Sequence, residues 1–251
     1  IAMPSFAIHL ANLADAEGID LGSSSVRIIV TSAETLSEAK REKLQRVWNA
    51  EVYDVFGMSE AGLMGAESKA HDGIHIWTDL FYIEVVDPET GRQVPEGEIG
   101  TFCVTPLYTG HATPFLRWNS GDIDTYIDRS ASDGVHAELF PMIKHASRTT
   151  GFFKIRGVNV NHAELEDFMF RNPAINDFQG VLVTDDSGLE TMRLRIEVKR
   201  GVDPAPVEAE LLKAVKHTFE VTAEIERLDT GSLAKAFEGS IKAPRFVDER
   251  T

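Results

Sequence analysis

The chain has 251 residues, a formal net charge of −15 and one cysteine, Cys103. The length allows one large or two ordinary domains, the acidic charge argues against nucleic acid as a partner, and the lone cysteine excludes an intrachain disulfide and fits a reducing cytosol. No apolar run reaches the ~18 residues of a membrane helix and no signal peptide opens the chain, so we expect no membrane partner and a cytoplasmic location.

Residues 1–73 alternate between helical and strand patterns, which predicts an α/β region. The first helix is expected over 5–16 and the second over 35–48, the latter opened by a Thr35/Glu38 capping box. The apolar side chains expected to share a face are Phe6, Leu10 and Leu13 in the first helix and Leu44, Val47 and Trp48 in the second.

Two apolar runs, 26–30 and 52–56, predict buried strands of the same region. Each run ends in polar residues: Ser32-Ala33-Glu34 follow the first, and Ser59-Glu60 follow the second. Ligands of open α/β sheets bind at the carboxyl ends of strands, so these residues are candidates for a binding site.

Residues 74–130 change to short alternating runs separated by turns, which predicts a β-rich subdomain. The strands are expected at 81–86, 100–104, 115–118 and 125–127, with a hairpin turn at 87–91. Cys103 falls in one of these runs and is expected to be a buried, inert thiol.

From residue 151 the pattern is β-α-β-β-α-β, which predicts a small α+β domain over 151–251 after a first domain over 1–147. The elements are expected at 152–155, 161–170, 181–184, 192–198, 206–219 and 223–228. Residues 229–251 are expected to be a Gly-rich loop and tail.

The stretch Phe56-Gly57-Met58-Ser59-Glu60-Ala61 carries the most chemistry. Gly57 marks an exit from the strand at which backbone can approach a ligand. The Ser59 hydroxyl can bond a phosphate oxygen, and the Glu60 carboxylate is a ligand that Mg²⁺ prefers. An ordinary strand and turn would give the same pattern, so this stretch alone leaves both interpretations open.

Three later stretches follow in order. Ser120-Gly121-Asp122 offers an acceptor for ribose hydroxyls, although Asp122 would also suit a solvated turn. Arg148 precedes the run Ile155-Arg156-Gly157-Val158-Asn159-Val160, and Lys242 lies in Gly239-Ser240-Ile241-Lys242-Ala243-Pro244-Arg245 near the end.

Taken together, these stretches resemble the motifs of the adenylate-forming (acyl-CoA synthetase) superfamily, and within it the phenylacetate-CoA ligase group. The resemblance runs colinearly from residue 1 to residue 250. It implies an α/β and β-rich remnant of the large adenylation domain, followed by the small α+β C-terminal domain. It also implies an ATP-dependent ligase that converts an aromatic carboxylic acid to an acyl-adenylate and then to a CoA thioester.

The resemblance assigns roles residue by residue. Catalysis would rest on Lys242, which stabilises charge on the α-phosphate, and on Glu60, which holds Mg²⁺. The other assignments are ATP or AMP binding by Ser32, Ala33, Glu34, Asp54, Phe56, Gly57, Ser59, Asp122 and Arg148, and CoA binding by Arg156, Gly157 and Val158.

The chain departs from the family pattern at several positions. Thr149-Thr150 stand where the family hinge is an Asp or Lys, and Asn119 stands where a basic residue is common. A solvated tail lysine is the plain alternative for Lys242, and Lys235 is its rival for the catalytic role. Ala66 and Ser68 replace the cysteines that bind zinc in some relatives, so no structural zinc is expected.

The family's Ser/Thr/Gly-rich phosphate loop has no counterpart in the sequence, which suggests an N-terminally truncated chain that is inactive alone. ATP, Mg²⁺ and CoA are the cofactors and co-substrates implied. Two alternatives stay open: transfer of the acyl group to an amine or carrier protein, and a non-catalytic descendant of the fold. The acid itself and the oligomeric state, with a homodimer as one option, are not specified.

Overall fold

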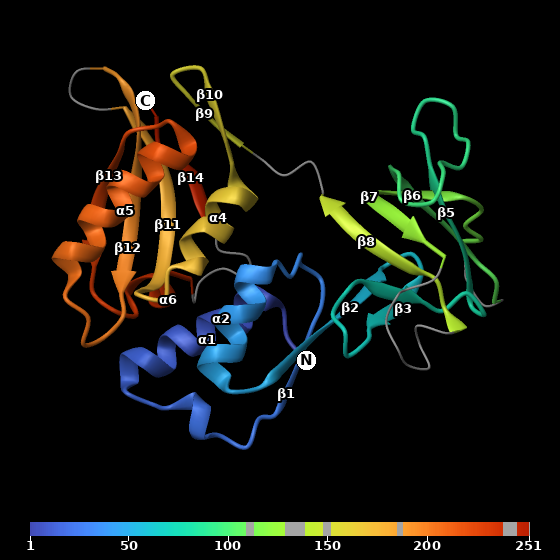
Figure 1. The fold of residues 1–251 in the computed structure, drawn as a ribbon, viewed down its shortest axis with the longest axis horizontal. Coiled ribbons are helices and arrows are strands. Elements are labelled where there is room, and N and C mark those ends of the chain that lie inside the picture. Colours follow the sequence, from blue (N-terminus) through green and yellow to red (C-terminus); the bar gives the residue numbers. More distant parts are fainter. Residues whose placement is uncertain (109–112, 129–138, 148–151, 185–187, 238–244, 251) are drawn as a thin grey trace. The chain divides into compact units, whose positions relative to one another are not determined.

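The computed structural model describes residues 1–108, 113–128, 139–147, 152–184, 188–237 and 245–250 (Figure 1). Contacts divide the chain into unit 1, made of Ile1–Pro4, Ile28–Leu36 and Glu51–Thr149, and unit 2, made of Ser5–Arg27, Ser37–Ala50 and Thr150–Thr251. This grouping places both N-terminal helices with the C-terminal residues. The predicted division into 1–147 and 151–251 follows chain order instead and stays a prediction.

Unit 1 is built on an eight-stranded sheet with the order β1-β2-β3-β4-β8-β7-β6-β5. Only β1 and β2 pair in parallel, and the other neighbours are antiparallel. The strands are β1 (Ile28–Thr31), β2 (Glu51–Met58), β3 (Gly62–Glu67), β4 (Ile74–Ile76), β5 (Phe81–Val86), β6 (Ile99–Pro106), β7 (Trp118–Ile127) and β8 (Met142–Ser147).

The core of unit 1 collects the inward residues of these alternating strands. Met64, Ile76, Val85, Phe102 and Ile143 are completely buried within one hydrophobic cluster. Cys103 is buried as predicted, and burial raises the pKa of its thiol. The prediction that this part of the chain is rich in strands is confirmed, because β4, β5, β6 and β7 all lie between residues 74 and 127.

Two details of unit 1 differ from the prediction. Ile28 is 59% exposed, so the first strand is only partly buried. The predicted strand at 115–118 is wrong except for its last residue, because β7 begins at Trp118 and the preceding Arg117 has a positive φ of 48°. The turn at 87–91 is confirmed: Asp87 Oδ1 accepts from the Thr90 amide at 2.7 Å, and the Gly91 amide donates to the Asp87 carbonyl at 2.8 Å.

Unit 2 contains a four-stranded sheet of order β13-β12-β11-β14 and a separate β9–β10 hairpin. Figure 1 shows α4 and α5 over the larger sheet, and the rings of Phe168 and Phe219 join the two helices at 5.3 Å. The elements are α1 (Pro4–Glu17), η1 (Leu21–Ser23), α2 (Glu38–Trp48), β9 (Phe152–Ile155), β10 (Val158–Asn161), α4 (His162–Arg171), β11 (Ile175–Thr184), β12 (Glu190–Val198), α5 (Pro204–Phe219), β13 (Ala223–Leu228), α6 (Ser232–Phe237) and β14 (Phe246–Asp248).

The helices of unit 2 are confirmed, but two local predictions are wrong. Ser37, not Thr35, caps α2, because its side chain accepts from the Lys40 amide. In α1, Phe6 is 49% and Leu10 is 38% exposed, while the small face with Ala7 and Ala11 is buried. Small side chains allow the helix backbone to pack closely against its neighbours. In α1 this close packing buries the alanine face in preference to the longer side chains of Phe6 and Leu10.

The described residues of the C-terminal stretch, 229–237 and 245–250, contain regular structure where a loop and tail were predicted. They include α6 and β14, and β14 pairs in parallel with β11 through Gly180↔Phe246 and Leu182↔Asp248. Strand β14 has only three residues, which is too short for an alternating pattern to be visible in the sequence. Such a strand can still form when it pairs with the edge of an existing sheet, here β11. No helix in the described part of the chain is long and apolar enough to span a membrane.

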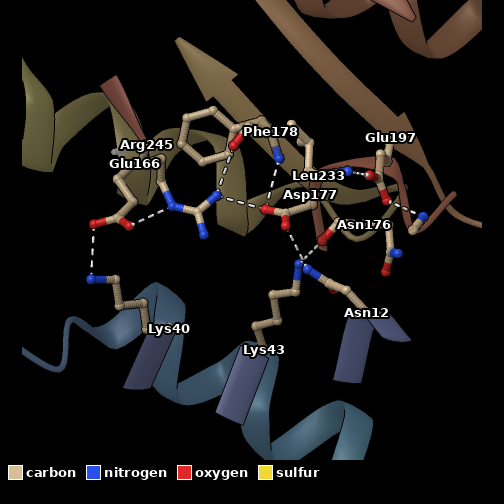
Figure 2. A network of polar contacts seen from close by, with 11 residues as sticks. Asn12, Lys40, Lys43, Glu166, Asn176, Asp177, Phe178, Glu197, Leu233 and Arg245 are labelled. Carbon is tan, nitrogen blue, oxygen red and sulfur yellow. Dashed lines mark hydrogen bonds and ion pairs between the residues drawn. The ribbon is translucent and has the colours of Figure 1, made fainter. Parts of the chain in front are cut away.

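A buried polar network joins α1 and α2 to the C-terminal residues of unit 2 (Figure 2). Asp177 lies at its centre: Arg245 Nη1 is 2.6 Å from Asp177 Oδ1, and Asn12 Nδ2 donates to Asp177 Oδ2 at 2.8 Å. Glu166 accepts from Arg245 at 3.1 Å and from Lys40 at 2.8 Å. Asp177 and Glu166 therefore each have a permanent cation as a partner.

Lys43 is the most deeply buried cation of this network. Its amine donates to the Asn176 carbonyl and lies 4.7 Å from the ring centre of Phe170. Burial lowers the pKa of Lys43 to about 8, although the charge of Asp177 opposes this shift. The network thus contains one lysine that can lose its proton near neutral pH.

Candidate functional site

The carboxyl ends of β1 and β2 meet, as their parallel pairing requires. Thr31 is in register with Asp54, and its hydroxyl donates to Asp54 Oδ1 at 2.8 Å. Ser32-Ala33-Glu34 follow directly, with Ala33 in a left-handed conformation at φ 69°. This bend turns the chain at the end of β1, so the predicted Ser32–Glu34 and Asp54 come from the same edge of the sheet.

The turn Ser59-Glu60-Ala61 joins β2 to β3 as a hairpin, in line with the predicted position after a strand. Ala61 is held from both sides: its amide donates to the Met58 carbonyl at 3.1 Å and its carbonyl accepts from Tyr108 at 2.7 Å. Glu60 forms no hydrogen bond or ion pair with any other residue that the structure describes. Its carboxylate is available for a cation.

Gly57 lies within β2 rather than at its exit, which corrects the prediction. A Cβ atom at Gly57 would be 2.6 Å from the Gly62 carbonyl oxygen on β3. The close neighbour that requires glycine here is therefore the backbone of β3, not a ligand. A direct role of Gly57 in nucleotide binding stays a prediction.

Asp122 is also inside a strand, not in a turn that closes one. Gly121 has φ 76° and the β7 pairing shifts register at this point, which marks a β-bulge. The Ser120 hydroxyl donates to the Phe102 carbonyl at 3.0 Å and accepts from the Asp122 amide at 2.9 Å. The bulge is thus pinned to β6, and it fixes the backbone of Asp122.

The aromatic ring of Phe56 lies between two other rings. Its centroid is 5.6 Å from that of Phe102 and 4.8 Å from that of His145, with edge-to-face geometry in both pairs. A flat side chain held in this way can flank a nucleobase, as predicted for Phe56.

His145 and Asp124 form an ion pair that the sequence did not reveal. They are cross-strand partners on β7 and β8, and His145 Nδ1 is 2.5 Å from Asp124 Oδ1. Burial opposes the charge of His145, but the hydrogen bond and charge of Asp124 outweigh it, so the pKa of His145 is raised. The one available signal was the spacing of Asp122 and Asp124, which places both on the same face of a strand.

The charges of Asp54 and Asp122 also raise the pKa of His145. These two residues and Asp124, here called the acidic cluster, come from β2 and β7, and their charges act on the His145 side chain that contacts Phe56. The structure therefore brings together Asp54, Phe56 and Asp122, which the sequence placed in one nucleotide site from separate motifs.

The predicted CoA residues lie in unit 2, on the turn between β9 and β10. Arg156 and Gly157 form a two-residue turn with φ 49° and 89°, the geometry of a tight hairpin. The Arg156 amide donates to Glu190 Oε2 at 3.1 Å, and Arg156 Nε donates to the Glu190 carbonyl at 2.7 Å. Gly157 is required by backbone conformation, because no atom lies within 4 Å of a Cβ there.

Two predicted residues, Arg148 and Lys242, and the pair Thr149-Thr150 lie outside the described residues. The rival lysine, Lys235, is exposed at the end of α6. The choice between Lys242 and Lys235 therefore stays a prediction. Among the described residues, no group of three or more His, Cys, Asp or Glu side chains could hold a metal ion.

Two family models match the chain. One, AMP-binding enzyme, covers residues 1–106, and the other, AMP-binding enzyme C-terminal domain, covers residues 157–250. Among curated proteins, the chain is 31% identical to phenylacetate-coenzyme A ligase of Thermus thermophilus over 98% of the chain and 59% of that protein. It is 27% identical to the enzyme of the same name from Aromatoleum evansii, over 98% of the chain and 57% of that protein.

Solved structures give the same picture. The fold matches 2-hydroxyisobutyryl-CoA ligase in complex with R3-HIB-AMP with a TM-score of 0.75 at 25% identity, over 99% of this chain and 54% of that one. A complex of the same ligase with 2-HIB-AMP and CoA matches with a TM-score of 0.53 at 26% identity, over 99% and 54% of the two chains. The chain thus spans a little over half the length of the relatives it matches. It belongs to the AMP-binding, or adenylate-forming, enzyme family.

Proposed function

We propose that the enzyme containing this chain activates an aromatic carboxylic acid with ATP and transfers the acyl group to CoA. In the first step, a carboxylate oxygen of the acid attacks the α-phosphorus of ATP, and the bond to pyrophosphate breaks. In the second, the thiol sulfur of CoA attacks the acyl carbon, and AMP leaves. The cytosol, which supplies ATP and CoA, is the proposed compartment.

The observation that supports this proposal is that Phe56 contacts His145 at 4.8 Å while the charges of Asp54 and Asp122 act on the same histidine. Their chemistry suits an adenosine: Phe56 offers a ring to the base, and Asp122 offers an acceptor to the ribose hydroxyls. Relatives named as acid–CoA ligases support the reaction class. Ser32, Ala33, Glu34 and Ser59 are proposed to complete the nucleotide site from the adjoining strand ends.

Glu60 is the proposed ligand of Mg²⁺. Its carboxylate has no partner among the described residues, which fits a metal that takes one or two protein carboxylates and completes its shell with phosphate oxygens and water. The metal, when bound, would neutralise phosphate charge. Replacing Glu60 with Gln should lower the rate of pyrophosphate release by about a hundredfold at limiting Mg²⁺.

A panel of aromatic acids tests the reaction, with pyrophosphate release measured in the presence and absence of CoA. We expect CoA-dependent thioester formation with at least one acid. Glu98→Gln, an exposed carboxylate of the same unit, is the control and should leave the rate unchanged. Product that forms with an amine but not with CoA would reject CoA as the acceptor.

The two half-reactions are proposed to use different parts of the C-terminal residues. Lys242→Ala should slow acyl-adenylate formation by about a hundredfold while sparing thioester formation from supplied adenylate. Lys235→Ala is the matched control. Gly157→Trp should show the reverse pattern, because the Arg156-Gly157-Val158 turn is proposed to line the path of the CoA thiol. If both changes slow the same half-reaction, a single arrangement of the site serves both steps.

A further inference from the structure

The acidic cluster has an unusual partner in His145. The Asp124 side chain is completely buried, whereas the His145 side chain is 27% exposed, and their 2.5 Å contact runs directly across the β7–β8 pair. Neither oxygen of the Asp124 carboxylate has a hydrogen bond of ordinary geometry in the part of the chain that the structure describes, so the close ion pair with His145 is the polar contact that the structure shows for it. The buried charge of Asp124 therefore acts mainly on His145, the side chain with which it is paired.

His145 also touches the proposed base-binding ring. The imidazole packs edge-to-face on Phe56 at 4.8 Å, while the other neighbour of that ring, Phe102, is completely buried. The imidazole consequently lies between an aromatic side chain and the carboxylates of the acidic cluster. Its exposed edge is the part of this arrangement that a ligand can approach.

The charge of this region depends on the proton of His145. Among the described residues, the charged groups with the largest effect on it are Asp124 and Asp122 from β7 and Asp54 from β2, and all three favour the imidazolium. The pKa of His145 is raised above the ordinary ~6.5, so the cation persists to higher pH than in a solvated histidine. Burial raises the pKa of Asp124 as well. The ion pair therefore exists at pH values above the pKa of Asp124 and below the pKa of His145: at lower pH the carboxylate is protonated, and at higher pH the imidazole is neutral.

We propose that His145 is a positioning residue of the nucleotide site, whose imidazolium balances the acidic cluster so that an anionic nucleotide can bind beside Phe56. This inference rests on the proposed function. Without the cation, three neighbouring carboxylates would repel the phosphate of AMP. A neutral nucleoside should feel little of this repulsion, and that difference separates a role of charge from a role of packing.

The experiment compares AMP with adenosine by titration calorimetry at about pH 7 and about pH 9, both above the second phosphate pKa of about 6, so that the charge of AMP stays nearly constant. For the wild-type enzyme, AMP affinity should fall on the order of fivefold at the higher pH, as expected for loss of one charge at partial exposure, while adenosine affinity stays nearly constant. His145→Gln should bind AMP weakly at both pH values. His145→Lys, which keeps a permanent cation, should restore AMP affinity and remove the pH dependence.

His217→Gln is the matched control, because it removes an exposed histidine on α5 in unit 2. It should retain the full pH dependence. The imidazole pKa of His145, followed by NMR, should fall in Asp124→Asn, and this readout does not depend on ligand binding.

Equal loss of AMP and adenosine affinity in His145→Gln would overturn the inference and leave the proposed function intact. Unchanged AMP affinity in that variant would do the same. A wild-type enzyme that binds neither ligand at either pH would instead reject the proposed nucleotide site itself.

Discussion

Two charged regions of this molecule, the network of unit 2 and the acidic cluster with His145, are built from different cations. In the network of unit 2, Asp177 and Glu166 are held by Arg245 and Lys40, which stay charged across the physiological range. In unit 1, the buried Asp124 is held by His145, which does not. Permanent cations suit a region whose task is to hold the fold, whereas a titratable cation beside a partly buried aromatic ring suits a region that exchanges charge with a ligand.

The comparison predicts first that breaking the unit 2 network costs stability and not binding. Asp177→Asn removes the carboxylate that pairs with Arg245 and whose charge favours the Lys43 cation. Arg245 keeps Glu166 as a partner, so the free energy of unfolding should fall by about 3 kcal/mol, the lower end of the range for breaking a buried ion pair. Urea denaturation measures this change. Asp248→Asn, at an exposed pair with Arg250, is the control and should have little effect. An Asp177→Asn protein as stable as the wild type would mean that the network contributes no stability.

A second prediction concerns Lys43, the exception among the cations of unit 2. Its pKa is about 8 in the folded protein and ~10.4 in the unfolded chain, so the unfolded chain binds more protons between these values. Stability should therefore rise with pH in that window, by about 2–3 kcal/mol. Urea denaturation between about pH 8 and about pH 10 tests the slope.

Lys43→Met should remove this rise, because the buried titrating group is gone. The exposed Lys213 supplies the control, since Lys213→Met should keep the wild-type slope. A slope that survives in Lys43→Met would assign the pH dependence to other groups.

The third prediction concerns a carboxylate of unit 1, whose loss should affect ligand binding and not stability. Asp122→Ala should weaken AMP binding by roughly tenfold to a hundredfold, because a carboxylate that accepts hydrogen bonds from a ligand contributes about 1.5–3 kcal/mol. Calorimetry gives the affinity, and thermal unfolding should show only a small change. A large loss of thermal stability with unchanged AMP affinity would mean that Asp122 stabilises the fold, as Asp177 does, and does not bind the nucleotide.

The smallest expected effect is at Gly157. Its φ of 89° is costly for residues with a side chain, so Gly157→Ala should destabilise the protein by about 1 kcal/mol even though the space for a Cβ is free. Gly188→Ala, at φ 79° with equally free space, is a matched comparison. If Gly157→Ala is neutral, the turn can adopt another conformation, and the backbone explanation for this glycine fails.

The sequence predicted the fold well where periodic patterns and resemblance agreed. Helices α4 and α5 and strands β9, β12 and β13 lie close to their expected ranges, because long amphipathic patterns persist after packing. The buried face of α1 was missed, because a stripe of alanines carries a weaker pattern than Phe6 and Leu10.

The candidate site was predictable only in part. Asp54, Phe56 and Asp122 were predicted for one nucleotide site from the sequence, which stays a prediction, and pairing of β2 with β3 and of β7 with β6 and β8 sets where they lie. His145 escaped because its role depends on cross-strand register with Asp124, which a bulge shifts by one residue. Register of this kind follows from tertiary structure, not from local pattern.

Strand β2 changes partner along its length, and this limits how sequences of the family can be recombined. Residues Glu51–Asp54 pair in parallel with β1, and Val55–Met58 pair with β3, where a side chain at Gly57 would meet the Gly62 carbonyl oxygen. A chimera with a crossover inside residues 51–58 would place one half of β2 next to a neighbouring strand that comes from a different relative. Exchange of nucleotide-site variants between relatives should therefore succeed with crossovers in the loops before and after β2–β3, and fail within β2.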